Sequence, residues 1–206
     1  MHRHLLGRLP HVGLTRRGRR QATALPQRLE LYATSIAALY VSPQQRAAET
    51  AEPIGRADSV APQPMDGLAE VDFGAWTGLS FAELDRDPAW RDYNAHRATA
   101  VVPLGESAVD LHHRVVRALT EIATTHAGAM VAVVTHAEII RTIVLHCSGR
   151  SLDEFHTVAI DPASISSVEL GDTARLLFAN SLDGERRTVR QTRAELGANF
   201  RDDRIP

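Results

Sequence analysis

The segment 130–141, which reads MVAVVTHAEIIR, constrains the fold of this chain more than any other. Its first five residues are apolar and three of them are valine, a pattern typical of a strand buried on both faces of a sheet. After a polar break at Thr135 and His136, apolar residues recur at helical spacing, which predicts a helix from about Ala137. This places His136 at the carboxyl end of a sheet, where open α/β sheets bind ligands and helix N–H groups favour an anion. The segment by itself is equally compatible with a histidine on a surface loop.

Strands and helices alternate along the chain, which predicts an α/β fold with a mostly parallel sheet between two layers of helices. Pro26 should kink or divide the first helix, because an interior proline costs about 3 kcal/mol. Ser42 and Pro43 fit a helix cap and a first helical position, and Ser107 fits the cap of a long helix. We expect helices at 15–31, 44–57, 80–86, 88–95, 107–126 and 151–155, and extended segments at 35–41, 60–64, 130–134, 165–170 and 174–179.

The length of 206 residues favours a single domain over 1–206, ending in a polar tail from about residue 181. The formal net charge of −2 gives no reason to expect binding to nucleic acid or to a membrane. Cys147 is the single cysteine, so an internal disulfide and a cysteine-based metal cluster are excluded, and no other residues show metal-ligand spacing. No apolar run approaches the ~20 residues of a membrane span and no signal-peptide core is present, so we expect a cytoplasmic protein.

Four segments carry a family resemblance. They read SPQQRAAETA at 42–51, EVDFGAWTGL at 70–79, PLGES at 103–107 and VVTHAEIIR at 133–141. In this order they resemble the motifs S-P-x-x-R-A-x-x-T-A, E-x-x-F-G-x-W-E-G, P-x-G-E-S and V-V-[ST]-H-x-x-x-I-R of the histidine phosphatase superfamily, the phosphoglycerate-mutase-like proteins. Thr77 stands where glutamate is usual. The resemblance covers roughly residues 14–180 and implies the three-layer α/β/α fold of that family.

The resemblance also implies a phosphate site. It gives Arg46 the role of a phosphate-binding arginine, Glu70 that of a general acid, and His136 that of a histidine donating to phosphoryl oxygens as charge builds. An apolar wall beside Glu70 would raise its pKa into the range that a general acid needs. The plainer alternatives are a solvated surface arginine, an exposed loop carboxylate and a loop histidine. Phe73 and Trp76 are expected to pack in the core rather than to bind a ligand.

The N-terminus departs from the family pattern. The family begins with an apolar strand that ends in Arg-His-Gly, and this histidine becomes phosphorylated. Here Arg3-His4 is preceded by two residues and followed by leucine, while Arg8 matches the family's second phosphate-binding arginine. Two alternatives stay open: Arg3-His4 is a compressed form of the motif, with His4 as nucleophile and Arg3 on the phosphate, or the chain begins after the motif. We expect the pocket to be largely present and the nucleophile to be missing or badly placed.

For function, the resemblance implies a phosphomonoesterase that acts through a phosphohistidine on a small phosphorylated substrate, without metal or cofactor. One alternative is phosphotransfer of the phosphoglycerate mutase type. Others are a non-catalytic protein that binds a phosphorylated ligand, and an interaction domain that uses only the fold. The family's specificity arises largely from a variable region that corresponds to 81–102 here, so the sequence does not predict which substrate is bound.

Overall fold

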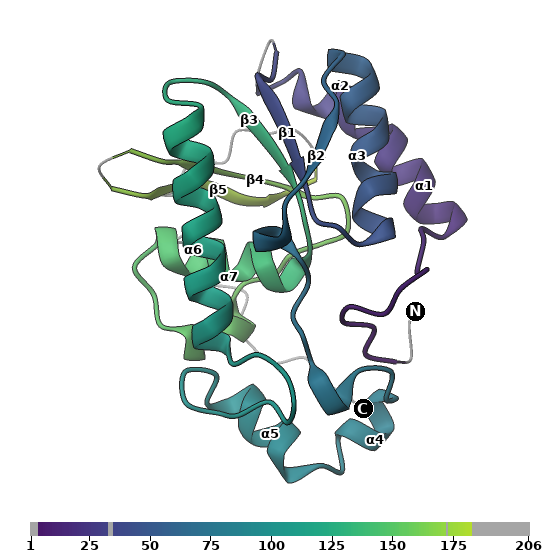
Figure 1. Ribbon diagram of the computed structural model, residues 1–206, viewed down its shortest axis with the longest axis vertical. Coiled ribbons are helices and arrows are strands. Elements are labelled where there is room, and N and C mark those ends of the chain that lie inside the picture. The colour runs from purple at the N-terminus through teal and green to yellow at the C-terminus, as the bar shows by residue number, and fades with distance from the viewer. Residues whose placement is uncertain (1–3, 33–34, 172, 183–206) are drawn as a thin grey trace.

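Two β-sheets organise the fold (Figure 1). The computed structural model describes residues 4–32, 35–171 and 173–182. In the larger sheet, β1 (Ala38–Val41) lies between β2 (Pro62–Pro64) and β3 (Val131–Val134), and both pairings are parallel. The smaller sheet is an antiparallel pair formed by β4 (Ile165–Glu169) and β5 (Arg175–Ser181).

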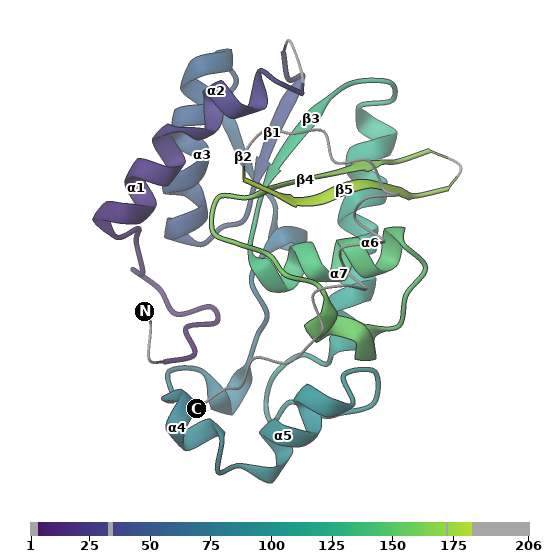
Figure 2. The ribbon, with the colours of Figure 1, turned by 180° about the vertical axis from the view of Figure 1, so that it is seen from behind.

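Helices cover both faces of the larger sheet (Figures 1 and 2). One layer contains α1 (Arg16–Thr23), α2 (Leu25–Leu29) and α3 (Gln45–Asp58), with α3 packed on all three strands. The other contains α6 (Ala108–Thr125) and α7 (Ala137–Cys147), and α7 also contacts β4 and β5. This arrangement confirms the expected α/β class with a parallel sheet between two helical layers.

The rest of the chain forms short helices that lie toward one end of the sheet, at the bottom of Figure 1. Ser80 caps α4 (Phe81–Leu84) and Asp87 caps α5 (Pro88–Ala95), each by accepting a backbone N–H with its side chain. Ser107 caps α6 in the same way. The short elements are the 3-10 helices η1 (Asp66–Leu68), η2 (Gly74–Trp76) and η3 (Leu152–Thr157) and the α-helices α4 (Phe81–Leu84) and α5 (Pro88–Ala95).

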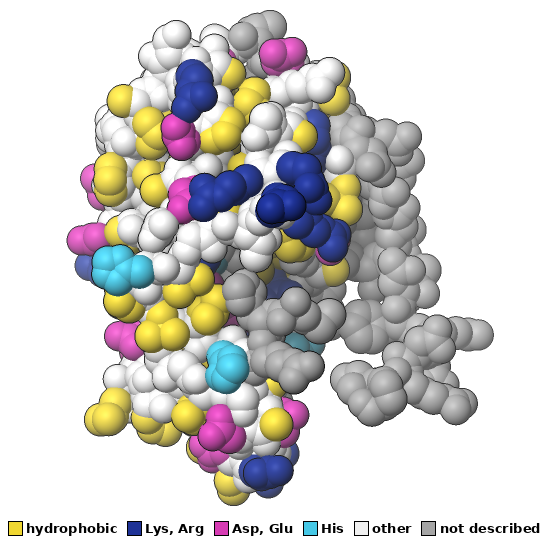
Figure 3. Space-filling view, turned by 90° about the vertical axis from the view of Figure 1, so that its right-hand side faces the viewer, with side chains coloured by type: hydrophobic (Ala, Val, Ile, Leu, Met, Phe, Trp, Pro, Cys, Tyr) yellow, Lys and Arg dark blue, Asp and Glu magenta, His cyan; other side chains and the backbone are white. Residues whose placement is uncertain are grey.

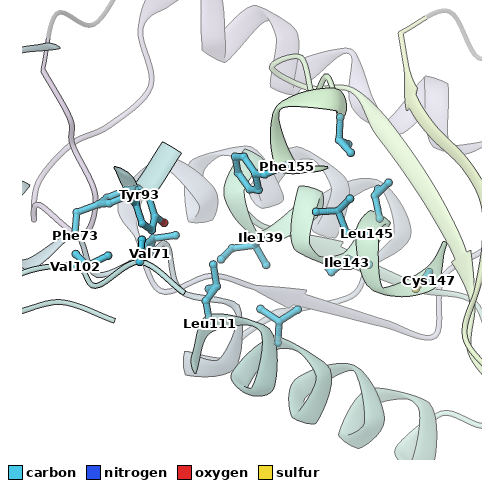
Figure 4. Close-up of a cluster of buried hydrophobic side chains, with 14 of the residues drawn as sticks. Val71, Phe73, Tyr93, Val102, Leu111, Ile139, Ile143, Leu145, Cys147 and Phe155 are labelled. Carbon is cyan, nitrogen blue, oxygen red and sulfur yellow. The ribbon is translucent and has the colours of Figure 1, made fainter. Parts of the chain in front are cut away.

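The larger hydrophobic core lies between α6, α7 and these short elements (Figure 4). Leu111 from α6 and Ile139 from α7 are buried in it, together with the aromatic side chains of the region 73–93. Phe73 and Trp76 are 3% and 2% exposed, so the prediction that both pack in the core is confirmed. The Trp76 indole N–H donates to a carboxylate oxygen of Asp87 at 2.8 Å, which ties η2 to the start of α5.

The first helical region confirms the prediction for Pro26, whereas the predicted start of the next helix is wrong. The helix expected over 15–31 is divided at Ala24 into α1 and α2, because Pro26 occupies the first turn of α2, where its missing N–H costs little. The assignment of Ser42 as the cap of the next helix is wrong. Gln44 is the N-terminal flanking residue of α3, and Ser42 turns its hydroxyl toward His136 instead.

The prediction that the segment before His136 is buried on both faces is wrong for most of its length. Val134 is buried, whereas Val131, Ala132 and Val133 are only half-buried. The reason lies in the neighbours rather than in the strand itself. Among the described residues, β3 pairs with β1 on one edge and with no strand on the other.

The C-terminal hairpin extends further than the sequence predicts. β5 continues through Asn180 and Ser181, beyond the extended segment expected at 174–179, and Ser181 is 5% exposed beside Tyr32. The remainder of the predicted tail, 183–206, lies outside the described residues, as does residue 172 in the hairpin turn. Within the described part of the chain, no helix has both the length and the apolar character that a membrane crossing needs.

The face seen in Figure 3 carries many of the basic side chains. Arg16, Arg17, Arg19 and Arg20 are all exposed on α1. Arg19 forms a 3.1 Å ion pair with Glu49 of α3, so this helix has a solvated, charged outer surface. Within the described part of the chain, no hydrogen bond or ion pair links these four arginines to Arg46, Glu70 or His136.

Candidate active site

Three of the predicted site residues meet at the carboxyl ends of β1 and β3. Arg46 lies in the first turn of α3, His136 immediately precedes α7, and Glu70 follows η1. One carboxylate oxygen of Glu70, Oε2, is 3.7 Å from Arg46 Nη2 and 3.6 Å from His136 Nδ1. The guanidinium and the imidazole are therefore close enough to contact one phosphate group from two sides.

The Arg46 guanidinium is only partly satisfied by the protein. Its side chain is 17% exposed, and Nη2 donates to the Gly7 carbonyl at 2.8 Å. Nη1 is buried and has no hydrogen-bond partner among the described residues. A buried guanidinium N–H without an acceptor is costly, so this nitrogen marks a position where an anion's oxygen would be favourable.

A hydrogen-bonded chain fixes the orientation of His136. The Glu70 N–H donates to Gln44 Oε1 at 3.0 Å, and the Ser42 hydroxyl donates to the same oxygen at 2.6 Å. Ser42 Oγ therefore accepts from His136 Nε2, which lies 2.6 Å away. This assigns the His136 proton to Nε2 and leaves the lone pair of Nδ1 facing Glu70.

Burial shifts both titratable groups toward their uncharged forms. Burial, reinforced by the negative charge of Glu138, raises the pKa of Glu70 to about 8, although the Val71 N–H, Arg46 and Arg114 oppose the shift. Burial, with the positive charges of Arg46 and Arg114, lowers the pKa of His136 to about 3. At neutral pH the site thus holds a carboxylic acid that can donate a proton and a neutral imidazole.

Arg8 reaches the site from the other side of Glu70. Its Nε donates to the Glu70 carbonyl at 2.7 Å, Nη2 donates to Glu106 at 2.9 Å, and Nη1 is 3.7 Å from Asp72. Every nitrogen of this guanidinium already faces a protein oxygen. These contacts give Arg8 a role in holding the main chain at Glu70, and its assignment to phosphate stays a prediction.

Glu106 from the PLGES segment completes this support. Its Oε1 accepts from Arg8, from Arg114 Nη2 at 2.7 Å and from the Asp72 N–H at 2.9 Å. Arg114, on α6, also donates to the carbonyls of Gly67 and Ala69 at 2.9 and 3.0 Å. We call Arg8, Glu106 and Arg114 the clip, because together they fix the backbone on both sides of Glu70.

The structure does not bring His4 to the same place. His4 is exposed, and its backbone forms an isolated antiparallel bridge with Ser80 at the start of α4. No hydrogen bond or ion pair of the described residues joins it to Arg46, Glu70 or His136. Arg3, the other residue of the predicted motif, lies outside the described residues.

Ser42, Gln44 and Glu106 are site residues to which sequence reasoning gave no role or another one. Ser42 was expected to cap a helix, since serine before proline is a common helix start, and this pattern hid its contact with His136. Gln44 and Glu106 both lie inside motifs that carry the family resemblance. Their position in these motifs was the one signal that could have identified them as site residues. In the described part of the chain, no three His, Cys, Asp or Glu side chains gather in a way that could hold a metal ion.

The sequence that contains these residues matches a known protein family. The family model of the histidine phosphatase superfamily (branch 1) matches residues 2–180, so the chain is a member of that superfamily. The Bifunctional protein Rv2228c of Mycobacterium tuberculosis is 36% identical over 135 residues, which are 65% of this chain. The matched part is 37% of that relative's length, so the chain corresponds to a minor part of it.

Other relatives match over more of their length. Phosphoserine phosphatase 1 of Hydrogenobacter thermophilus is 28% identical over 167 residues, 80% of this chain and 78% of that protein. The structure of Bacillus stearothermophilus YhfR superimposes with a TM-score of 0.81 at 26% identity, over 88% of this chain and 91% of the other. A phosphoserine phosphatase from Entamoeba histolytica, solved with 3-phosphoglyceric acid, gives a TM-score of 0.78 at 21% identity, over 88% and 90% of the two chains, and shows the likeness of fold.

Proposed function

We propose that this site binds the phosphate group of a small phosphomonoester and that the chain is a phosphomonoesterase whose turnover depends on His4 reaching the bound phosphorus. The observation that carries the proposal is the buried Nη1 of Arg46, which has no hydrogen-bond partner among the described residues and lies at the carboxyl end of a parallel sheet beside Glu70 and His136. A phosphate oxygen satisfies this N–H, and the N-terminus of α7 adds further donors. Phosphoserine and related phosphorylated hydroxy acids are the first substrates to test, in view of the relatives described above.

The protonation states of Glu70 and His136 suit the cleavage of a phosphate ester. In the first step a nitrogen of His4 forms a bond to phosphorus as the P–O bond of the ester breaks, and Glu70, which carries a proton at neutral pH, gives it to the leaving oxygen as the general acid. In the second step water attacks phosphorus, the P–N bond breaks, and the Glu70 carboxylate takes a proton from that water. A bound phosphate dianion also raises the pKa of His136, because its negative charge favours the imidazolium, and a protonated Nδ1 then donates to a phosphoryl oxygen.

A second candidate function has one specific observation in its favour. A phosphohistidine forms only if a nitrogen of His4 attacks phosphorus, and His4 is exposed beside Ser80. A chain with this arrangement binds phosphate esters without forming the covalent intermediate. In that case the protein is a receptor for a phosphorylated ligand rather than an enzyme.

Binding and turnover are separated by two measurements. Inorganic phosphate and vanadate should raise the melting temperature of the wild-type chain, and Arg46→Ala should abolish this rise. Arg56→Ala is the matched control, because Arg56 lies on the same helix with a 76% exposed side chain and should leave the rise intact. An equal rise in Arg46→Ala would place the anion elsewhere. Hydrolysis of p-nitrophenyl phosphate, lost in Glu70→Gln, then distinguishes the enzyme from the receptor.

A further inference from the structure

Arg97 is a buried arginine outside the group of residues described so far. Its side chain is 4% exposed, and its guanidinium carbon lies 4.2 Å from the ring centre of Tyr93 and 3.7 Å from that of Phe155. Both rings belong to the larger hydrophobic core (Figure 4). A guanidinium between two aromatic faces, away from water, is attracted by both rings, so its position is closely defined.

The hydrogen bonds of Arg97 direct this cation to one carboxylate. Nη1 donates to Glu138 Oε2 at 2.8 Å and to the Tyr93 hydroxyl at 3.0 Å, while Nη2 donates to Asn94 Oδ1 at 3.2 Å. Arg141, almost one turn further along α7, lies 3.4 Å from the other carboxylate oxygen of Glu138. The Glu138 side chain is 18% exposed, and each of its oxygens has an arginine partner.

Glu138 lies close to the proposed general acid. It is in the first turn of α7, two residues after His136, whose Nδ1 is 3.6 Å from Glu70 Oε2. Burial is the largest cause of the raised pKa of Glu70, which is about 8, and the negative charge of Glu138 is the next. The carboxylate that Arg97 holds therefore favours the proton on Glu70.

The other side chains around the Glu70 carboxyl oppose its proton or carry no charge. Arg46 from α3 and Arg114 from α6 are positively charged and favour the carboxylate. His136 is neutral near pH 7, because burial and the same two arginines lower its pKa to about 3. Among these groups, Glu138 is the one that supplies negative charge.

Two further carboxylates of this region are paired within the part of the chain that supports Glu70. Glu106 is 2.9 Å from Arg8, and Asp72 is 3.7 Å from the same guanidinium, whose Nε donates to the Glu70 carbonyl. Glu138 takes its arginine partners from α7 and from the segment after α5 instead. Its charge can therefore be removed without disturbing the clip.

We propose that Glu138 is a positioning residue for Glu70, and that Arg97 fixes the place from which Glu138 acts. This rests on the proposed function, because it takes Glu70 as the general acid. A buried ion pair is a weak means of joining two elements, since apolar side chains of similar volume often do as well. The Arg97 Nε is also buried without a hydrogen-bond partner among the described residues, which is a cost. An uncharged tie would avoid both costs, but it would not favour the Glu70 proton.

The proposal is tested by ¹³C NMR of the full chain labelled at the glutamate side-chain carboxyl carbon, with Glu70→Gln identifying the signal of Glu70. Wild-type Glu70 should titrate near pH 8. Glu138→Gln keeps an acceptor for Arg97 but removes the charge, so we expect the Glu70 titration to move down by about one pH unit. Glu169→Gln removes a charge from an exposed ion pair with Arg175 and should leave the Glu70 titration where it is.

Arg97→Lys tests the second part of the proposal. It keeps the positive charge but loses the planar fork that contacts Glu138 and Tyr93 together. We expect the Glu70 titration to move in the same direction as in Glu138→Gln, by a smaller amount. In the double variant, Arg97→Lys should add nothing to the effect of Glu138→Gln, because Arg97 acts through Glu138. A further shift in the double variant would show that Arg97 acts on Glu70 by another route.

These readouts do not depend on turnover. An unchanged Glu70 titration in Glu138→Gln, whatever its loss of stability, would overturn the proposal and leave the ion pair as a structural tie. Failure of the proposed function would appear elsewhere, as phosphate binding that persists in Arg46→Ala. Should Arg97→Lys fail to fold, Tyr93→Phe takes its place, because it keeps the ring and removes one hydrogen bond of Arg97.

Discussion

At the scale of single residues, the site is defined by two groups that the fold holds uncharged. Glu70 is raised to a pKa of about 8 and His136 lowered to about 3, and burial is the largest cause of both shifts. Both groups are therefore uncharged at neutral pH, where an exposed glutamate would be ionised, and pKa values shifted in this way are common in acid–base sites. Burying these two groups costs free energy of folding, which the surrounding packing offsets. Because this cost depends on their protonation, the stability of the protein depends on pH.

The first prediction concerns Glu70→Gln. The unfolded chain loses the Glu70 proton near pH 4.5, whereas the folded chain keeps it up to about pH 8. The contribution of Glu70 to the stability of the wild-type protein should therefore fall as the pH rises through this window, by an amount on the order of a few kcal/mol. The lowered pKa of His136 acts in the opposite direction up to about pH 6.5, so the net fall in stability is expected above that pH. Glu70→Gln should remove most of that slope and be the more stable protein at pH 8. Urea unfolding at pH 5, 6, 7 and 8 measures both, and equal slopes for the two proteins would contradict the shift.

The second prediction concerns Ser42→Ala. Ser42 is fully buried and provides the 2.6 Å acceptor of the His136 Nε2–H, so its loss leaves a buried donor with only the longer contact to Gln44. We expect a loss of about 1–3 kcal/mol in the free energy of unfolding. Ser164→Ala is the control, because Ser164 Oγ is buried without a hydrogen-bond partner among the described residues. A comparable loss in both variants would show that the hydroxyl contact with His136 has no special weight.

At the scale of elements, the site depends on how the segment between β2 and α4 is held. This segment contains Glu70 but has no regular ladder of backbone hydrogen bonds, only the 3-10 helices η1 and η2. The clip replaces the ladder: Arg114 anchors the carbonyls before Glu70, and Arg8 anchors that of Glu70 itself. α6 is thus both a packing helix and the support of the segment that contains Glu70.

The third prediction concerns Glu106→Ala. Removing this carboxylate leaves two guanidinium groups close together without their shared partner, in a site where all three side chains are largely buried or half-buried. We expect a loss of about 3 kcal/mol or more in stability, together with weaker phosphate binding because the main chain at Glu70 is released. Glu52→Ala is the control, since its ion pair with Arg56 is exposed and contributes about 0–1 kcal/mol. Unchanged phosphate affinity in Glu106→Ala would show that the clip does not position Glu70.

Elements that could be predicted from the sequence are those whose signals are local. α6 has a serine cap and a continuous apolar stripe, and α7 follows directly from the pattern of isoleucines, so α6 was found with nearly correct ends and α7 with the correct start. The half-buried state of β3 could not be predicted in this way. Hydrophobic periodicity reports the side chains of a strand, whereas burial also depends on the neighbour that its backbone finds.

The site shows the same division. The meeting of Arg46, Glu70 and His136 was expected from motifs that follow strand ends. The contact of Ser42 with His136 was not expected, because it joins residues 94 positions apart and competes with a local capping pattern. The clip was missed for the same reason, as Arg8 and Glu106 are 98 positions apart.

At the scale of the whole molecule, two hydrophobic cores lie on opposite faces of a sheet that is incomplete among the described residues. One core joins α2, α3 and β1, and the other joins α6, α7 and the short elements. A cavity of about 1290 Å³ reaches the residues of both cores, and Arg46, Glu70 and His136 are among the residues that line it.

The last prediction concerns turnover by the chain in this state. A phosphohistidine intermediate requires a nitrogen of His4 at bonding distance from a phosphorus atom that Arg46 holds. His4 is instead exposed, and its backbone is bridged to Ser80, whose side chain is engaged in the cap of α4. Moving His4 to the phosphate breaks this bridge without any replacement contact in the described structure. We therefore expect very weak hydrolysis of p-nitrophenyl phosphate.

His4→Ala should change that rate little, no more than His113→Ala at an exposed position on α6. The decisive measurement is acid-labile incorporation of phosphate from a reactive donor such as phosphoramidate, followed on the intact chain. We expect none above background, because a binding pocket without a positioned nucleophile lowers only the cost of bringing the ester to the site. Stoichiometric labelling that disappears in His4→Ala but persists in His113→Ala would show that the N-terminal segment folds inward over the site and that His4 is the nucleophile.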